Sequence, residues 1–279
     1  MTEETAKIDS FALSHQGKYR EDNQDSIRVC DSSEAAAVTH GHLYAVANGM
    51  GGYSHGGVAS ALALETFCST VFSSNPSNLP NAMKRAINDA NLAVYQQAHR
   101  MGVARMGTTL TAVIIVGNKM HIAHIGDSRA YLIRNGSASL LTNDHTSVGE
   151  LVRMKVLSPS KVRTHARRSE LNKCLGVELF VSPDISTVPI MPGDVLILCS
   201  DGVWSMIEDN EFAELTARNS NLEALSHAVL EMAMDRDSDD NVSVVTIHAE
   251  QLAAHAPDTS SNSGWKIPGL FRNRITNRS

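Results

Sequence analysis

The sequence lacks the features that mark several classes of protein. Its four cysteines include no Cys-x-x-Cys pair, which argues against a zinc knuckle or a thiol redox motif. No apolar run approaches the roughly 20 residues of a membrane-spanning helix. The polar, mildly acidic N-terminus also lacks the basic and apolar regions of a secretory signal. We therefore expect no membrane span, and we expect a reducing cytoplasm as the compartment.

The chain also has fewer basic than acidic residues. The chain has 24 Lys and Arg against 30 Asp and Glu, a net charge of −6 at pH 7. Binding to nucleic acid needs a basic surface that neutralises phosphates, so we expect no nucleic-acid partner. What is present is globular material, with 42% hydrophobic and 19% charged residues in 279. We expect a monomer with one domain over residues 1–252.

Short apolar runs bounded by turn residues predict β-strands. Asn135-Gly136 is a strong hairpin signal, and Gly117-Asn118-Lys119 indicates a second tight hairpin. Hairpins imply antiparallel sheets. The predicted strands are Leu43–Ala47, Thr109–Val116, Met120–Ile125, Ala130–Arg134, Val195–Cys199 and Val242–Ile247.

Three other segments have helical patterns. Apolar residues recur at helical period in Asn81–Arg100 and in Asn221–Asp235. Val58–Val71 is apolar nearly all round, which predicts a buried helix. Because strands and helices do not alternate strictly, the fold class we expect is α+β.

Two segments are less regular. Residues 144–190 are locally basic, and we expect a helical insertion with a mobile connection. From about Ala253 the chain is rich in Ser, Asn and Pro. We expect the tail, residues 253–279, to be disordered, and a docking strip in it is the alternative. That strip would consist of Trp265, Ile267, Leu270 and Phe271.

Polar side chains stand at the ends of several predicted strands. Asp127 and Asp201 each follow a strand closely, Asp240 stands just before one, and Asn48 ends another. Antiparallel neighbours bring such positions to one sheet edge, where Asp25 is a further candidate. Gathered carboxylates repel one another, and hard oxygen ligands favour Mg²⁺ or Mn²⁺. Asp and Gly at strand ends are also ordinary turn residues, so spacing alone leaves both interpretations open.

Seven short motifs occur in a fixed order along the chain. They are Arg20 to Ser26, Val46 to Gly52, Gly107-Thr108-Thr109, Gly126-Asp127-Ser128-Arg129, Leu141 to His145, Cys199-Ser200-Asp201-Gly202 and Asp240-Asn241. Together they resemble the metal-dependent protein phosphatases (the PPM, or type 2C, family) in their bacterial single-domain form. The resemblance covers roughly residues 10–250. The ordered set is highly specific, although each motif alone is weak.

The resemblance implies a fold and a metal centre. The fold is two packed antiparallel sheets with helices on both outer faces. The centre holds two Mn²⁺ or Mg²⁺ ions, and often a third in bacterial members. The positions that match metal ligands, with Gly49 acting through its carbonyl and Asp25 through water, are Asp25, Asn48, Gly49, Asp127, Asp201 and Asp240.

The reaction that the resemblance implies is hydrolysis of phosphoserine and phosphothreonine in proteins, opposing a serine/threonine kinase. Two cations about 4 Å apart lower the pKa of a water between them and offset phosphoryl charge. Arg20 would grip the phosphate. Residues 144–190 would form a flap beside the cleft, and we expect its Arg163 and Arg167 to contact substrate. No phosphoenzyme is required, so Cys199 is expected in the core and His145 is expected to be structural.

Asn48 departs from the family pattern, which has an aspartate bridging two ions at this position. An amide is neutral, and its NH₂ group repels a cation. We therefore expect weakened binding of the second ion, because Asp201 and Asp240 still hold the first. Engineered inactivation, a natural pseudophosphatase and a weakly active enzyme all explain an asparagine here. Deamidation of Asn48-Gly49 would recreate the aspartate, and we expect activity to grow as the protein ages at alkaline pH.

Two other functions remain to be tested. A non-catalytic module would bind phosphoproteins through Arg20 and the basic flap without turnover. A structural calcium site would be stabilised by Ca²⁺ more than by Mn²⁺. Nucleotide binding at Gly49–Gly57 is disfavoured, because the stretch contains neither Gly-Lys-Ser/Thr nor G-x-G-x-x-G.

Overall fold

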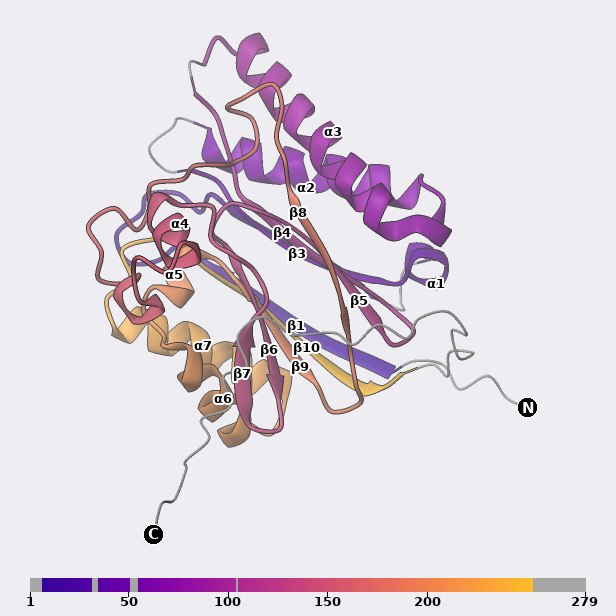
Figure 1. The fold of residues 1–279 in the computed structure, drawn as a ribbon, viewed down its shortest axis with the longest axis vertical. Coiled ribbons are helices and arrows are strands. Elements are labelled where there is room, and N and C mark those ends of the chain that lie inside the picture. Colours follow the sequence, from indigo (N-terminus) through magenta and orange to yellow (C-terminus); the bar gives the residue numbers. More distant parts are fainter. Residues whose placement is uncertain (1–6, 32–34, 51–54, 104, 253–279) are drawn as a thin grey trace.

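Two five-stranded antiparallel sheets pack face to face in the computed structural model, which describes residues 7–31, 35–50, 55–103 and 105–252 (Figure 1). The first sheet has the order β1 (Lys7–His15), β10 (Val242–Gln251), β9 (Val195–Cys199), β6 (Arg129–Arg134) and β7 (Ser137–Leu140). The second has the order β2 (Asp25–Cys30), β3 (His42–Asn48), β4 (Leu110–Val116), β5 (Lys119–Ile125) and β8 (Asp184–Pro189). The tail, with its predicted docking strip, lies outside the described residues.

Helices cover the outer face of each sheet (Figure 1). The second sheet carries α1 (Ala35–His40), α2 (Gly56–Phe72) and α3 (Leu79–Arg100), and the first carries α5 (Asp201–Trp204), α6 (Asp209–Arg218) and α7 (Leu222–Asp235). The remaining helix, α4 (Ser147–Arg153), and the short 3₁₀ turns Pro76–Asn78 and Pro159–Lys161 complete the described helical elements. The layered α+β architecture expected from the resemblance is confirmed. Within the described residues, no helix is both long and apolar enough to cross a bilayer.

Strand β3 shows why the sheet sequences are apolar without a break. Successive side chains of a strand point to opposite faces. Tyr44 and Val46 pack between the sheets, while Leu43 and Ala45 pack under the helices with Phe67 of α2. Both faces are therefore buried, and the polar residues are confined to the strand ends. This confinement concentrates functional side chains at one edge.

The sequence predicted most of the core elements. All six apolar runs are strands, and Asn135 and Gly136 adopt the positive φ values, 52° and 72°, of a tight hairpin turn. Helix α2 is less enclosed than its composition suggested, because Val58 remains 41% exposed on the side away from α3 and the sheet. Strands β1, β2, β7 and β8 are not among the six predicted runs.

The flap is shorter than predicted. Residues 184–189 form β8, which pairs with β5 and is part of the second sheet. The excursion from the sheets therefore ends at 183 rather than near 190, and we use "flap" below for residues 144–183. Helix α4 is its one regular helix of more than a single turn among the described residues. The sequence does not distinguish the edge strand β8 from the predicted insertion, because half of its side chains are polar.

Candidate functional site

The polar strand ends meet at one edge of the sandwich, where they border a cavity of about 700 Å³. Asn48 ends β3 and lies directly opposite Asp25, the first residue of β2. Asp201 follows β9 as the first residue of α5, and Asp240 precedes β10. Of the residues predicted for a metal site, those that line the cavity are Asn48, Asp127, Asp201 and Asp240.

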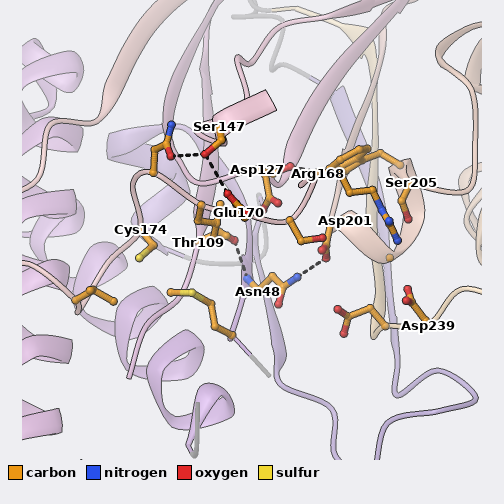
Figure 2. Close-up of a pocket in the computed structure, with 18 of the residues that line it drawn as sticks. Asn48, Thr109, Asp127, Ser147, Arg168, Glu170, Cys174, Asp201, Ser205 and Asp239 are labelled. Carbon is orange, nitrogen blue, oxygen red and sulfur yellow. Dashed lines mark hydrogen bonds between the residues drawn. The ribbon is translucent and has the colours of Figure 1, made fainter. Parts of the chain in front are cut away.

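Asn48 is tied to its surroundings by both side chain and backbone. Its Nδ2 donates a hydrogen bond to Asp201 Oδ1 at 2.5 Å (Figure 2). Its backbone N–H donates to Thr109 Oγ1 at 2.9 Å, and its carbonyl accepts from Thr109 N and Thr108 Oγ1, both at 3.0 Å. The amide therefore presents its nitrogen, rather than its oxygen, to the carboxylate that it faces.

Asp25 lies behind Asn48, buried, with no hydrogen bond to either carboxylate oxygen from any described residue. Burial raises the pKa of Asp25 to about 7. The hydroxyls of Ser243 and Ser200 offset this rise in part, but both are engaged in hydrogen bonds elsewhere. A buried carboxylate with unpartnered oxygens is costly, and a cation-bound water is one partner that would satisfy them.

Asp127 and Asp201 repel each other at the cavity. Burial, and then the charge of Asp144, raise the pKa of Asp127 to about 7. Burial together with Asp127, Asp240 and Asp25 raises the pKa of Asp201 well above its usual value. Divalent cations relieve such repulsion, and an all-oxygen set suits Mg²⁺ and Mn²⁺. The ligand type of these carboxylates therefore suits hard cations.

Their arrangement is not that of a finished metal site. Within the described residues, no three Asp, Glu, His or Cys side chains are grouped closely enough to hold one ion. Two of the carboxylates instead take polar partners, since Asn48 donates to Asp201 and Arg20 donates to Asp240. Arg20 Nη2 donates to Asp240 Oδ2 at 2.7 Å, and its Nε donates to the Asp239 carbonyl at 3.1 Å.

The arginines beside the cavity are only partly those predicted. Arg163 is outside it, because its side chain is 9% exposed and pairs with Asp209 at 2.6 Å and Glu208 at 3.1 Å. Arg167 is exposed, pairs with Glu170 at 2.7 Å, and does not line the cavity either. The lining instead includes Arg105 and Arg168, which the sequence did not single out because both lie in irregular loops. Figure 2 shows Arg168 reaching toward Ser205 at the cavity.

The remaining candidates have structural roles. His145 Nδ1 accepts a hydrogen bond from Gly126 N at 3.2 Å, and its ring stacks on His124 at 4.8 Å. It therefore supports the turn that carries Asp127, while Cys199 is fully buried as predicted. Cys174 was not expected at the cavity, yet it lines it. Burial raises the pKa of the Cys174 thiol to about 12, so this thiol is protonated and a poor nucleophile.

Comparison with known proteins gives a consistent result. A family model described as protein phosphatase 2C matches residues 15–236. The serine/threonine phosphatase stp of Listeria monocytogenes is 30% identical over 239 residues, covering 84% of this chain and 93% of that protein.

Three solved structures extend the likeness to the fold. The serine/threonine phosphatase PstP/Ppp of Mycobacterium tuberculosis has a TM-score of 0.78 at 30% identity, covering 88% of this chain and 99% of that one. Stp1 of Staphylococcus aureus has a TM-score of 0.80 at 26% identity, covering 90% and 98%. The catalytic domain of PstP, with a TM-score of 0.74 at 29% identity over 86% of this chain and 97% of that one, was solved with two manganese ions.

Proposed function

This chain belongs to the protein phosphatase 2C family of metal-dependent serine/threonine protein phosphatases, and from that premise we propose that the cavity at the sheet edge is its active site and that Asn48 weakens or abolishes the reaction there. The observation that carries the proposal is the hydrogen bond from Asn48 Nδ2 to Asp201. It places an amide donor where the family pattern has a carboxylate acceptor.

The residues that would hold cations are Asp25, Asp127, Asp201 and Asp240, together with the carbonyl of Gly49. We propose Mn²⁺ or Mg²⁺, in two sites with a third at Asp127. When bound, such ions activate water and offset the negative charge of a phosphoryl group. The two open oxygens of Asp25 and the mutual repulsion at Asp201 support this assignment.

The chain's own basic residues would bind the substrate. Arg20 can exchange the Asp240 carboxylate for a phosphate, since a guanidinium binds both with the same fork of donors. Arg168 and Arg105 add positive charge at the cavity wall. We therefore propose these two arginines as substrate contacts, and no longer Arg163 and Arg167. A phosphoenzyme is not part of the proposal, because the cavity thiol, Cys174, is protonated.

Asn48 acts through charge. Two dications about 4 Å apart repel by roughly 16 kcal/mol at an effective dielectric constant of 20, four times the unit-charge value. A bridging carboxylate offsets part of that repulsion, whereas an amide offsets little and here donates to Asp201 instead of accepting. We therefore propose that the second cation binds weakly. Engineered inactivation, a natural pseudophosphatase and a weakly active natural enzyme all fit this proposal.

The test is a phosphatase assay with Mn²⁺ on p-nitrophenyl phosphate and on a phosphothreonine peptide. Asn48→Asp should raise kcat at least about 100-fold, the order of effect of losing one charge-stabilising group in an active site. Asp201→Asn in the Asn48→Asp background is the control and should return activity to the level of the original chain. Equal activity with and without the aspartate would remove the proposed role of Asn48.

A second candidate is a phosphoprotein-binding module without turnover. This candidate is favoured by three arginines at the cavity, Arg20, Arg105 and Arg168, and by the neutral side chain of Asn48. This candidate predicts that the phosphothreonine peptide binds in the absence of Mn²⁺, and that no activity appears in the Asn48→Asp variant. An Arg20→Ala variant should then lose peptide binding.

We also propose the cellular setting. The substrates would be proteins phosphorylated on serine or threonine, with a serine/threonine kinase acting in opposition, and the enzyme would be a cytoplasmic monomer. The family membership and the acidic net charge of −6 support this setting. Gel filtration with light scattering tests the monomer, which a mass of twice 30.1 kDa would exclude.

A further inference from the structure

Arg129 is a buried cation two residues after Asp127. It is 3% exposed, and burial of an unpaired guanidinium would be very costly. Its Nε and Nη2 donate to the two oxygens of Asp144 at 2.9 and 2.6 Å, and its Nη1 donates to Tyr131 Oη at 2.9 Å. Every nitrogen of the guanidinium is thus engaged, which holds the side chain in one orientation.

The face of this guanidinium rests on the indole of Trp204, with Cζ 3.7 Å from the ring centroid. The same indole donates from Nε1 to the carbonyl of Asp127 at 2.8 Å. The backbone of Asp127 is therefore held by the indole of Trp204, and the side chain of Arg129, two residues along the chain, rests on that indole. A cation–π contact is stronger between desolvated partners than at an exposed surface, so this buried contact supports the position of Trp204.

The contacts continue from Arg129 to the flap. Tyr131 Oη donates to Asp209 Oδ1 at 2.9 Å, and Arg163 Nη2 donates to the same oxygen at 2.6 Å. Arg163 Nε also donates to the carbonyl of Trp204 at 2.8 Å. Arg163 lies within the flap and Asp144 is its first residue, whereas Tyr131, Trp204 and Asp209 belong to the first sheet or its helices. One continuous chain of polar contacts therefore joins the flap to the backbone of Asp127.

We propose that Arg129 is a positioning residue that couples the docking of the flap through Arg163 to the placement of Asp127 at the cavity. In a fully paired buried network, loss of one contact leaves a donor or acceptor unsatisfied and loosens its neighbours. Groups behind a metal ligand orient it, and their loss typically weakens metal binding about 10- to 100-fold. The metal part of the inference rests on the proposed function, but the mechanical coupling does not.

Three matched arginine-to-lysine variants test the coupling. Arg129→Lys keeps the charge but removes the fork of donors, and Arg163→Lys does the same at the flap end. Arg134→Lys is the control, because Arg134 ends the same strand with an equally bidentate pair to Asp194 at 2.7 and 2.5 Å, away from the cavity. Hydrogen–deuterium exchange of the peptide spanning 126–128 is measured without metal. Mn²⁺ binding is measured by calorimetry in the original chain and in the Asn48→Asp background.

Coupling predicts that Arg129→Lys and Arg163→Lys both speed exchange at 126–128 several-fold and weaken the weakest Mn²⁺ site about tenfold, while Arg134→Lys does neither. If Arg129→Lys does not fold, Arg163→Lys decides alone. Unchanged exchange at 126–128 in Arg163→Lys, or an equal change in Arg134→Lys, overturns the inference. If Mn²⁺ binds to neither background, the proposed function fails, and the exchange measurements still decide the coupling.

Discussion

Asn48 and Asp201, 153 residues apart in the chain, are joined by a hydrogen bond from the amide Nδ2 to the carboxylate Oδ1. Asp201 is crowded by three other carboxylates, and its pKa is raised by burial and by their charge. In this setting a neutral donor does part of what a cation would do, because it stabilises the negative charge of Asp201. The asparagine should therefore favour the metal-free protein and disfavour the metal-bound one.

The first prediction concerns stability without metal. Asn48→Asp removes the donor and adds a fourth neighbouring carboxylate, so it should lower the free energy of unfolding in EDTA by roughly 2 kcal/mol. Saturating Mn²⁺ should then stabilise Asn48→Asp more than the original chain. Thermal unfolding with and without Mn²⁺ measures both effects. Asn48→Ala removes the donor without adding charge, so it should lose stability in EDTA without gaining extra stabilisation from Mn²⁺. Equal stabilisation of Asn48→Ala and Asn48→Asp by Mn²⁺ would contradict this account.

The second prediction revises the expected deamidation of Asn48-Gly49. Attack of the Gly49 nitrogen on the side-chain carbon, with loss of ammonia, requires the backbone to turn. Here Gly49 N donates to Gln24 O at 3.0 Å, and a Cβ at Gly49 would lie 2.1 Å from the Gly56 carbonyl, so the backbone is held and closely packed.

Deamidation should therefore be slow in the folded protein and fast after unfolding. Peptide mapping of samples aged at alkaline pH, with and without denaturant, measures the two rates. Ageing of native protein alone should not raise phosphatase activity, and equal rates in both samples would show that the fold gives no protection.

The third prediction separates two adjacent flap residues. Arg168 lines the cavity and Arg167 does not. Loss of one charged contact to a phosphopeptide in a partly open cleft should weaken binding by about 1 kcal/mol, roughly fivefold. Arg168→Ala should therefore raise KM or Kd for a phosphothreonine peptide about fivefold with kcat little changed, whereas Arg167→Ala should change neither. Equal effects of the two would mean that flap charge acts only at long range.

The fourth prediction is a pH dependence away from the cavity. The hydrogen bond with Arg236 lowers the pKa of Glu211 to about 2, from a usual value near 4.5. Because the folded pKa is the lower one, the pair stabilises the protein above about pH 4.5 and loses its contribution as the pH falls toward 2.

Glu211→Gln keeps the oxygen that accepts from Glu208 N and removes only the charge. It should cost roughly 1 kcal/mol at pH 7, since the pair is partly exposed, and less at pH 3. Denaturant unfolding at several pH values measures this. Glu214→Gln, whose partner Arg218 is 3.4 Å away on the surface, is the control and should change little at any pH.

The elements that sequence reasoning located have either an unbroken apolar run or apolar residues at helical period. Strand β3 is buried on both faces and was predicted, whereas β1 and β8 were missed because they lie at sheet edges and mix polar with apolar residues. A partly exposed edge strand has the composition of a loop. Pairing partners decide its conformation, and those are distant in the chain.

The sequence likewise predicted the positions of some cavity residues but not their contacts. Strand ends correctly brought Asp127, Asp201 and Asp240 to one cavity, because the position of a residue in a strand determines which edge it reaches. The sequence could not show which hydrogen-bond partners those carboxylates take. In the structure, Arg20 donates to Asp240 and Asn48 donates to Asp201. The placement of Arg168 escaped prediction because an irregular flap has no periodicity from which to infer direction.

The pairing of β1 with β10 has a consequence for rearranged versions of the chain. Lys7 lies opposite Gln251 at one end of this pair, and His15 lies opposite Val242 at the other, next to the cavity. The two ends of the folded unit are therefore neighbours on the side remote from the cavity. A circularly permuted protein, with residues 7 and 251 joined by a short linker and new termini in an exposed loop, should keep the cavity intact.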